Sequence, residues 1–212
     1  AVIKPLVRRV AVIGAGGAGL AFGSVTKDSF DVVDIFEASS HVGGVWKYKN
    51  GVNDVMYSGL VTNLPKQIMQ YSDMDTFVSG GGLEEPFSFV THTEVQDYLE
   101  AFSKKHQLHE LIQHNTRVTS VRKTEDGGKW IVERQSGQGE DAVTVNSTYD
   151  AVVVCNGHYA VPSRPKIDGL DAFEGECIHS VDYDSDICAS LKGKRVLIVG
   201  ARASAVDIAR EM

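Results

Sequence analysis

A glycine-rich segment near the start of the chain could bind a phosphate group. Residues 14–19, Gly14-Ala15-Gly16-Gly17-Ala18-Gly19, follow the pattern G-x-G-x-x-G directly after an apolar run at 9–13, and we expect a helix from about Ala18. In such a unit the first glycine makes a tight turn, the second lets a pyrophosphate approach the backbone, and the third allows close helix–strand packing. The helix N-terminus then offers amides and a favourable dipole to a diphosphate.

An acidic residue further along the chain strengthens this interpretation. Glu37 directly follows a second apolar run at 32–36 and lies 23 positions after Gly14 (37 − 14). A carboxylate at this distance can accept hydrogen bonds from a ribose diol. The two runs predict parallel strands joined by a helix. We therefore rank a dinucleotide site above the alternative, a structural turn followed by a solvated acid.

Two further glycine-containing segments could also lie against a nucleotide ligand. Gly43-Gly44-Val45-Trp46 would permit close backbone approach to a large planar ligand, or equally form a turn with a core tryptophan. Gly200-Ala201-Arg202-Ala203-Ser204-Ala205 follows an apolar run at 195–199, a predicted strand, and precedes a predicted helix. This predicts a second pyrophosphate turn, but Arg202 stands at the middle glycine position. Its side chain would crowd the ligand, unless it turns outward and pairs with a phosphate; a degenerate strand–helix turn is the alternative.

Composition excludes several classes of function. Across 212 residues, 28 acidic against 21 basic side chains give a formal charge of −7, which disfavours a nucleic-acid partner. The three cysteines form no CxxC pair, which excludes a paired-cysteine zinc site and a CxxC redox centre within this chain and indicates free thiols in a reducing compartment, the cytoplasm. The histidines lack metal-ligand spacing, so we expect no metal. No apolar run is long enough to span a bilayer, and residues 1–9 lack the apolar region of a secretory signal.

The remaining elements must position these segments. After a loop-rich stretch at 48–86, a helix is predicted to begin at Thr93 with Gln96 as its capping-box partner. Strand-like runs at 117–123, 129–135 and 142–149, separated by turn residues, predict an antiparallel meander. A buried strand follows at 151–154, and Pro162 and Pro165 mark a linker between domains.

A longer motif lies between the two glycine turns. Residues 173–183 fit F-x-G-x-x-x-H-x-x-x-[FY], and with them the chain resembles the flavin-containing monooxygenase family. The resemblance covers essentially the whole chain, and its further motifs lie at 14–37, 43–46, 62–66, 156–158 and 200–209. Tyr183, where the related Baeyer–Villiger group usually has Trp, favours the N- and S-oxygenating branch of these class B flavoprotein monooxygenases. Arg202, and Asp184 where a basic residue is common, depart from the family's pattern.

The resemblance implies an α/β fold. We expect a Rossmann-like FAD-binding domain at 1–165, with a parallel sheet and an antiparallel β-meander insertion, and the start of a second Rossmann-like NADPH-binding domain at 166–212, apparently truncated. FAD would be bound by the residues Gly14, Gly16, Gly17, Ala18, Gly19, Glu37, Gly44, Val45, Trp46, Asn63 and Gly157. NADPH would be bound by Gly200, Arg202, Ser204 and Ala205.

The resemblance also implies a reaction. NADPH would reduce the flavin, O₂ would add to give a C4a-hydroperoxyflavin, and one oxygen atom would pass to the nitrogen of an amine or the sulfur of a sulfide. Asn63 would be the catalytic residue, because it would hold the oxygenated flavin by hydrogen bonding; that Asn63 merely turns the loop before Pro65 is equally compatible with the sequence. Phe173, Gly175 and His179 would shape the junction between the domains.

Two alternatives stay open. A flavin-dependent disulfide reductase ranks low, because it needs a CxxC near the flavin. A flavin-binding fragment or non-catalytic subunit, which NADPH could not reduce, is motivated by Arg202 and by the early end of the chain. The substrate, the choice of NADPH over NADH, a second chain or segment completing the fold, a homodimer, and membrane association through a region beyond Met212 are also left open.

Overall fold

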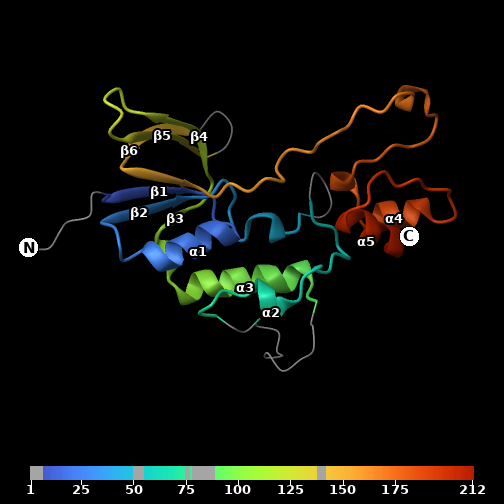
Figure 1. The fold of residues 1–212 in the computed structure, drawn as a ribbon, viewed down its shortest axis with the longest axis horizontal. Coiled ribbons are helices and arrows are strands. Elements are labelled where there is room, and N and C mark those ends of the chain that lie inside the picture. Colours follow the sequence, from blue (N-terminus) through green and yellow to red (C-terminus); the bar gives the residue numbers. More distant parts are fainter. Residues whose placement is uncertain (1–6, 50–54, 75–76, 78–88, 138–141) are drawn as a thin grey trace, which may run out of the picture. The chain divides into compact units, whose positions relative to one another are not determined.

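The structure is a computed structural model that describes residues 7–49, 55–74, 77, 89–137 and 142–212. The chain divides into two compact units, 1–44 with 96–157 and 45–95 with 158–212 (Figure 1). We call them the first unit and the second unit. The predicted domains, divided at residue 165, stay a prediction.

A parallel sheet forms the centre of the first unit. Its strand order is β3-β2-β1-β7, with β1 at Arg9–Ile13, β2 at Val32–Phe36, β3 at Ile112–Gln113 and β7 at Ala151–Val154. β1 pairs in parallel with both β2 and β7, as expected for apolar runs without alternation that are covered on both faces. The predicted strands at 9–13, 32–36 and 151–154 are confirmed, whereas the short β3 was not predicted.

Helices cover one face of this sheet (Figure 1). α1, at Gly17–Thr26, connects β1 to β2 and packs on both strands. Gly23 of α1 lies against Ile35, since a Cβ built on Gly23 would come within 2.9 Å of the Ile35 Cδ1 atom. α3, at His92–Lys105, presents Val95, Leu99 and Phe102 as a buried apolar face.

The start of α3 differs from the prediction. The capping box is made by Thr91 and Glu94: the Thr91 amide donates to Glu94 Oε2 at 2.8 Å, and the Glu94 amide donates to Thr91 Oγ1 at 3.3 Å. Thr93 and Gln96 have the same spacing, but Thr91 takes the capping position because it also bridges to Val61 immediately before the helix. The predicted capping role of Gln96 is therefore wrong, and its side chain is used elsewhere.

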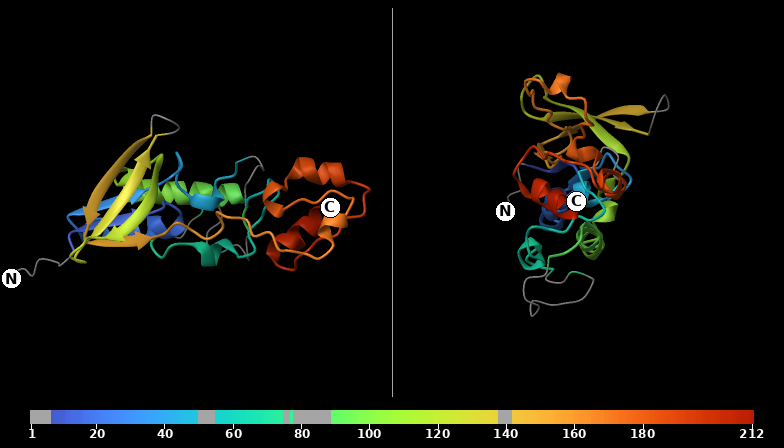
Figure 2. Two further views of the ribbon diagram at one scale, coloured as in Figure 1. Left: turned by 90° about the horizontal axis from the view of Figure 1, so that it is seen from above. Right: turned by 90° about the vertical axis from the view of Figure 1, so that its right-hand side faces the viewer.

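The antiparallel meander covers the other face of the parallel sheet (Figure 2). It consists of β4 at Thr116–Lys123, β5 at Trp130–Ser136 and β6 at Val143–Tyr149, in the order β4-β5-β6. The predicted meander is thus confirmed. The two sheets share a core of buried side chains, namely Ala11, Phe36, Val132 and Tyr149.

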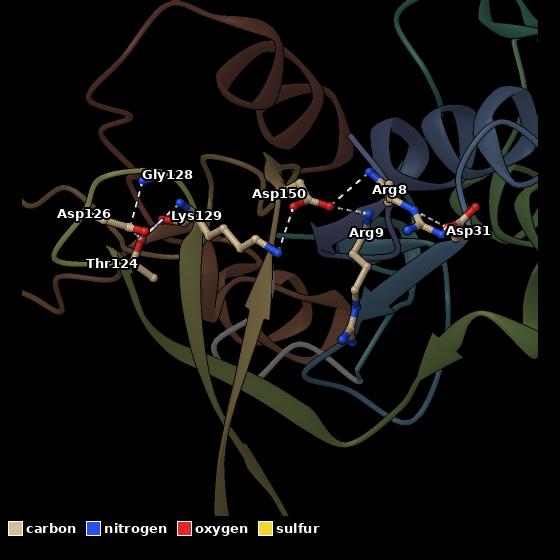
Figure 3. Close-up of polar contacts among 8 residues, drawn as sticks. All are labelled: Arg8, Arg9, Asp31, Thr124, Asp126, Gly128, Lys129 and Asp150. Carbon is tan, nitrogen blue, oxygen red and sulfur yellow. Dashed lines mark hydrogen bonds and ion pairs between the residues drawn. The ribbon is translucent and has the colours of Figure 1, made fainter. Parts of the chain in front are cut away.

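Asp150, in the turn between β6 and β7, ties the meander to the first strand (Figure 3). Its Oδ2 atom accepts hydrogen bonds from the amides of Arg8 at 2.9 Å and Arg9 at 2.8 Å. The Lys129 ammonium lies 3.4 Å from the other carboxylate oxygen. The amides of Arg9 and Arg8, followed by Lys129, lower the pKa of this carboxyl group.

The second unit contains mostly short helices. They are α2 at Lys66–Met69, α4 at Ser185–Leu191, α5 at Ala203–Glu211, and 3₁₀ turns at Leu170–Ala172 and Ser180–Asp182. Its core is formed by Tyr57, Tyr183 and Ile208. Parts of the predicted loop-rich stretch, at 50–54, 75–76 and 78–86, lie outside the described residues. In the described parts of the chain, no helix is both long and apolar enough to cross a membrane.

The predicted strand at 195–199 is wrong. These residues form no strand, and Leu197 and Val199 are 86% and 70% exposed. A parallel strand needs hydrogen-bonding neighbours, and the described residues of the second unit provide none beside this segment. The coarser prediction of a mixed α/β fold with a parallel sheet and an antiparallel meander is confirmed.

Replacing Asp150 by asparagine tests the tie between the sheets. We expect the free energy of unfolding at pH 7 to fall by about 1 kcal/mol, because charge-assisted hydrogen bonds are stronger than neutral ones, although partial exposure weakens them. Because the folded-state pKa is lowered, the carboxylate stabilises the fold above its unfolded-chain pKa of about 3.9, and this contribution is lost as the pH falls through the folded-state value.

The measurement is urea unfolding of wild type and Asp150→Asn at several pH values between neutrality and acid. The difference between them should shrink as the pH is lowered. Asp126→Asn is the matched control, since the hydrogen bonds of Asp126 to described residues go to Thr124 and Gly128 of its own turn (Figure 3). A stability loss in Asp126→Asn as large as that in Asp150→Asn would contradict the assigned role.

Candidate dinucleotide-binding site

Two glycines of the first bend are required by the packing of the protein itself. Gly14 has a φ of +101°, and a Cβ there would lie 2.5 Å from the Cys155 carbonyl oxygen. A Cβ on Gly19 would lie 1.9 Å from the Gly14 carbonyl oxygen. Any side chain at either position would therefore push α1 away from the ends of β1 and β7. These are the roles that the sequence assigned to the first and third glycines.

Gly16 is different, because neither its conformation nor its contacts require glycine. Its φ and ψ of −77° and −173° are extended values that any residue adopts. A Cβ there would meet only ordinary contacts, at 3.6 Å from Gly44 Cα and 3.9 Å from Gly44 N. The protein alone thus gives no reason for glycine at 16, whereas a ligand that touches the backbone would give one.

The amino end of α1 suits an anion. Gly17 and Ala18 begin the helix, Ala18 is exposed, and no side chain caps the N-terminus. The first turn of α1 also contains no acidic side chain that would oppose an anion at the positive end of the helix dipole.

Glu37 supports the bend from the side. It is 8% exposed; its Oε2 atom accepts a hydrogen bond from the Ala15 amide at 2.8 Å, and its Oε1 atom accepts from the Ser39 amide at 2.8 Å and the Ser39 hydroxyl at 2.7 Å. A carboxylate has about four acceptor positions, so these bonds leave room for a ribose hydroxyl. Sequence reasoning missed Ser39, although a hydroxyl two residues after the acid was a visible signal.

The segment at 43–46 does form a turn, and the turn lies against the bend. Gly43 and Gly44 have φ values of +103° and +61°, and the Gly43 amide donates to the Ala15 carbonyl at 3.0 Å. A Cβ on Gly44 would come within 3.2 Å of Gly16 Cα. The structure thus brings Gly44 together with the first bend and Glu37. Val45 and Trp46 follow in a short 3₁₀ turn and are half-buried.

Gly157 and Asn63 have different positions in the fold. Gly157 follows the end of β7 in the first unit, with a φ of +72° and open space where a Cβ would be. Asn63 belongs to the second unit and is exposed. Its neighbour Thr62 is buried and braces the loop, since Thr62 Oγ1 donates to the Leu64 carbonyl at 2.8 Å. The loop is thus held without the Asn63 side chain.

The second bend lies entirely in the second unit. Gly200 has a φ of +134°, a value that favours glycine. Arg202 is exposed and extended, with a φ of −95°, and precedes α5, whose first turn contains Ser204 and Ala205. No hydrogen bond or ion pair involves the Arg202 side chain within the described chain. The guanidinium is therefore available to a phosphate.

The 173–183 motif organises the second unit. His179 Nδ1 accepts a hydrogen bond from the Val181 amide at 3.2 Å, which leaves Nε2 to donate to the Ser163 carbonyl at 3.2 Å. Asp184 accepts hydrogen bonds from the Tyr48 hydroxyl and from the amides of Ser58 and Ser185. Burial tends to raise the pKa of Asp184, but the hydrogen bonds from Tyr48 and Ser58 outweigh it and lower the pKa to about 2. Asp184, which stands where the family commonly has a basic residue, thus has hydrogen-bond donors for its carboxylate.

The chain is similar to known proteins over nearly its whole length. The family model "Flavin-binding monooxygenase-like" matches residues 7–212. "Flavin-containing monooxygenase FMO GS-OX-like 2" of Arabidopsis thaliana is 35% identical over 224 residues, which cover 97% of this chain and 47% of that protein. The chain thus spans about half the length of the curated relatives it matches first.

Solved structures give the same result. The S-allyl-L-cysteine S-oxygenase from Allium sativum superposes with a TM-score of 0.82 at 35% identity, over 96% of this chain and 48% of that one. OTEMO, solved in complex with FAD and NADP, superposes with a TM-score of 0.64 at 26% identity, over 98% of this chain and 37% of that one. The predicted family is confirmed: the chain belongs to the flavin-binding monooxygenase-like family.

Proposed function

We propose that the first bend, with Glu37 and the Gly43–Gly44 turn, binds FAD, and that the protein uses NADPH and O₂ to oxygenate a sulfide sulfur or an amine nitrogen. The observation that carries the proposal is the glycine at position 16, because the fold itself does not require glycine there. A diphosphate that lies against the backbone at this position explains the residue. The amino end of α1, whose first turn contains no acidic residue, adds a favourable helix dipole at the same bend.

The residues present fit FAD. Gly14–Gly19 would hold the diphosphate, Glu37 the ribose, and Gly44, Val45, Trp46 and Gly157 would border the remainder of the cofactor. When bound and reduced, FAD supplies the activation of O₂ and the transfer of one oxygen atom. The protein's contribution is to bind, to orient and to exclude water.

The overall reaction balances with the proposed cosubstrates. A sulfide, O₂, NADPH and a proton give a sulfoxide, water and NADP⁺; an amine gives an N-oxide in the same way. The oxygenase from Allium sativum, by its name, acts on the sulfur of S-allyl-L-cysteine. We therefore place sulfides first among the candidate substrates.

A second candidate function is a flavin-binding subunit that NADPH does not reduce. Arg202 favours it, because a family glycine is replaced in the second bend. The discriminating experiment is to purify the protein, record its flavin absorbance and follow NADPH oxidation with and without a thioether. Bound flavin with no NADPH consumption would favour the subunit, and the absence of bound flavin, even after FAD is added, would exclude both functions.

Gly16→Ala tests the FAD site with little disturbance of the fold. The added methyl group makes only ordinary contacts with Gly44, so the melting temperature of the cofactor-free protein should change by no more than a few degrees. The same methyl group would occupy the approach of the diphosphate, and we expect FAD affinity to fall at least tenfold, about 1.4 kcal/mol. Calorimetric titration with FAD provides the measurement.

Gly23→Ala, on the same helix but away from the bend, is the control for Gly16→Ala. Its Cβ would press on Ile35, so it should lower stability and leave the affinity of the folded protein for FAD nearly unchanged. Equal FAD affinity in Gly16→Ala and wild type would contradict the proposed site.

Arg202→Gly tests the second bend. The exposed guanidinium has no partner in the described chain, so we propose that it contacts a phosphate of NADPH rather than obstructing the site. Arg202→Gly should weaken NADPH binding about tenfold, consistent with one charged hydrogen-bonding group, and Arg202→Lys should weaken it less. The measurement is titration of the FAD-loaded protein with NADP⁺; tighter binding by Arg202→Gly would show that the arginine obstructs.

Asn63→Ala tests the proposed catalytic residue. Because Thr62 braces its loop, removal of the exposed Asn63 amide should leave stability unchanged. If the amide helps to hold the oxygenated cofactor, NADPH oxidation should persist while product falls by about tenfold or more and hydrogen peroxide rises. The ratio of sulfoxide to NADPH consumed measures this, and an unchanged ratio would show that Asn63 only shapes the loop.

A further inference from the structure

Gln96 is a buried amide in the first unit that sequence reasoning assigned to helix capping. It is 4% exposed, and its Nε2 atom donates to the Val42 carbonyl at 2.9 Å and to Glu100 Oε1 at 2.7 Å. A carbonyl and a carboxylate can only accept, so the amide nitrogen must face them. This fixes the orientation of the Gln96 side chain and turns its Oε1 atom in the opposite direction.

The Oε1 atom lies against Gly43. A Cβ built on Gly43 would come within 2.0 Å of it, so the turn and the amide fit each other only because residue 43 is glycine. Oε1 is buried and accepts no hydrogen bond from any described residue. An unpaired buried amide oxygen costs free energy. The arrangement is therefore maintained by the two hydrogen bonds that the nitrogen donates.

These bonds are continuous with the candidate cofactor site. Val42 precedes Gly43, whose amide donates to the Ala15 carbonyl, and Gly44 then lies against Gly16. An open hollow of about 350 Å³, lined in part by His41, Val42 and Glu100, lies beside this turn. The hydrogen bond from Gln96 to the Val42 carbonyl, together with the Gly43–Ala15 bond, therefore holds the turn next to a space that side chains leave open.

We propose that Gln96 is a positioning residue for the dinucleotide site: it holds the Val42–Gly44 turn against the first bend and so sets the gap in which the diphosphate is bound. The proposal rests on the proposed function, since it assigns that gap to FAD. Gln96 acts through the turn and does not itself touch the cofactor.

Gln96→Met is the first test, because methionine keeps the length and volume of the side chain but donates no hydrogen bond. FAD affinity of the folded protein, measured by quenching of flavin fluorescence, should fall about five- to tenfold. In the cofactor-free protein, amide hydrogen exchange in a peptide covering 42–46 should become faster. Asp97→Asn, on the exposed face of the same helix, should leave both quantities unchanged.

A second pair of variants separates the two hydrogen bonds. Gln96→Glu cannot donate to Val42 and sets a second carboxylate beside Glu100, so it should also weaken FAD binding. The double variant Gln96→Glu/Glu100→Gln restores an amide–carboxylate pair but leaves no donor at position 96 for Val42. We expect the double variant to stay weak, and full recovery of FAD affinity would overturn the role assigned to the Val42 bond.

The outcomes distinguish this proposal from the proposed function. If wild type binds FAD and Gln96→Met binds it equally with unchanged exchange at 42–46, the positioning role is wrong and the proposed function stands. If Gln96→Met lowers only the melting temperature, the residue is merely structural. If wild type binds no FAD, the proposed function fails together with the assignment of the gap, and hydrogen exchange alone decides whether Gln96 holds the turn.

Discussion

The clamp on the peptide group of residue 15 is the constraint on which the first bend depends. The Ala15 amide donates to Glu37, and the Ala15 carbonyl accepts from the Gly43 amide. Glu37 is in turn held by the sheet, because its own amide donates to the Gln113 carbonyl at 3.0 Å. Bend, acid and turn are therefore joined by hydrogen bonds, and the amino end of α1 lies beside a carboxylate that can accept a further hydrogen bond from a hydroxyl. Such preorganisation lowers the ordering cost of binding a large cofactor.

The meander contributes to this clamp through the end of β2. Phe36, next to Glu37, meets Tyr149 edge-on at 6.1 Å, and Arg134 lies over the Phe36 ring at 5.0 Å. The Tyr149 hydroxyl donates to Asp34 at 2.7 Å; burial, followed by this hydrogen bond, raises the pKa of Tyr149 to about 12. The tyrosine thus stays protonated as a donor at physiological pH. The meander, which is remote from the bend in sequence, thus fixes β2, the strand that Glu37 follows.

Local patterns predicted those parts of the molecule whose partners are near in sequence or repeat a simple period. The strands at 9–13 and 32–36 and the glycine bend between them follow from apolar runs and turn residues alone. Gln96 could not be assigned this way, since Thr91–Glu94 and Thr93–Gln96 have the same spacing. Only tertiary contacts separate them, namely the bridge of Thr91 to Val61 and the hydrogen bond from Gln96 to Val42. The segment at 195–199, like 9–13, is an arginine followed by four apolar residues, but β1 becomes a strand because β2 and β7 satisfy its backbone on both sides.

The 173–183 motif gains a physical meaning from its packing, without any chemistry of its own. Its last residue, Tyr183, is buried beside Tyr57 and Ile208, and its hydroxyl donates to Glu211 of α5 at 3.1 Å. Tyr57 donates to Asp207 one turn earlier, at 3.0 Å. Two tyrosines therefore hold the helix whose amino end carries Arg202. These contacts fix the middle and the carboxyl end of α5, so its packing does not depend on which residue stands at 202.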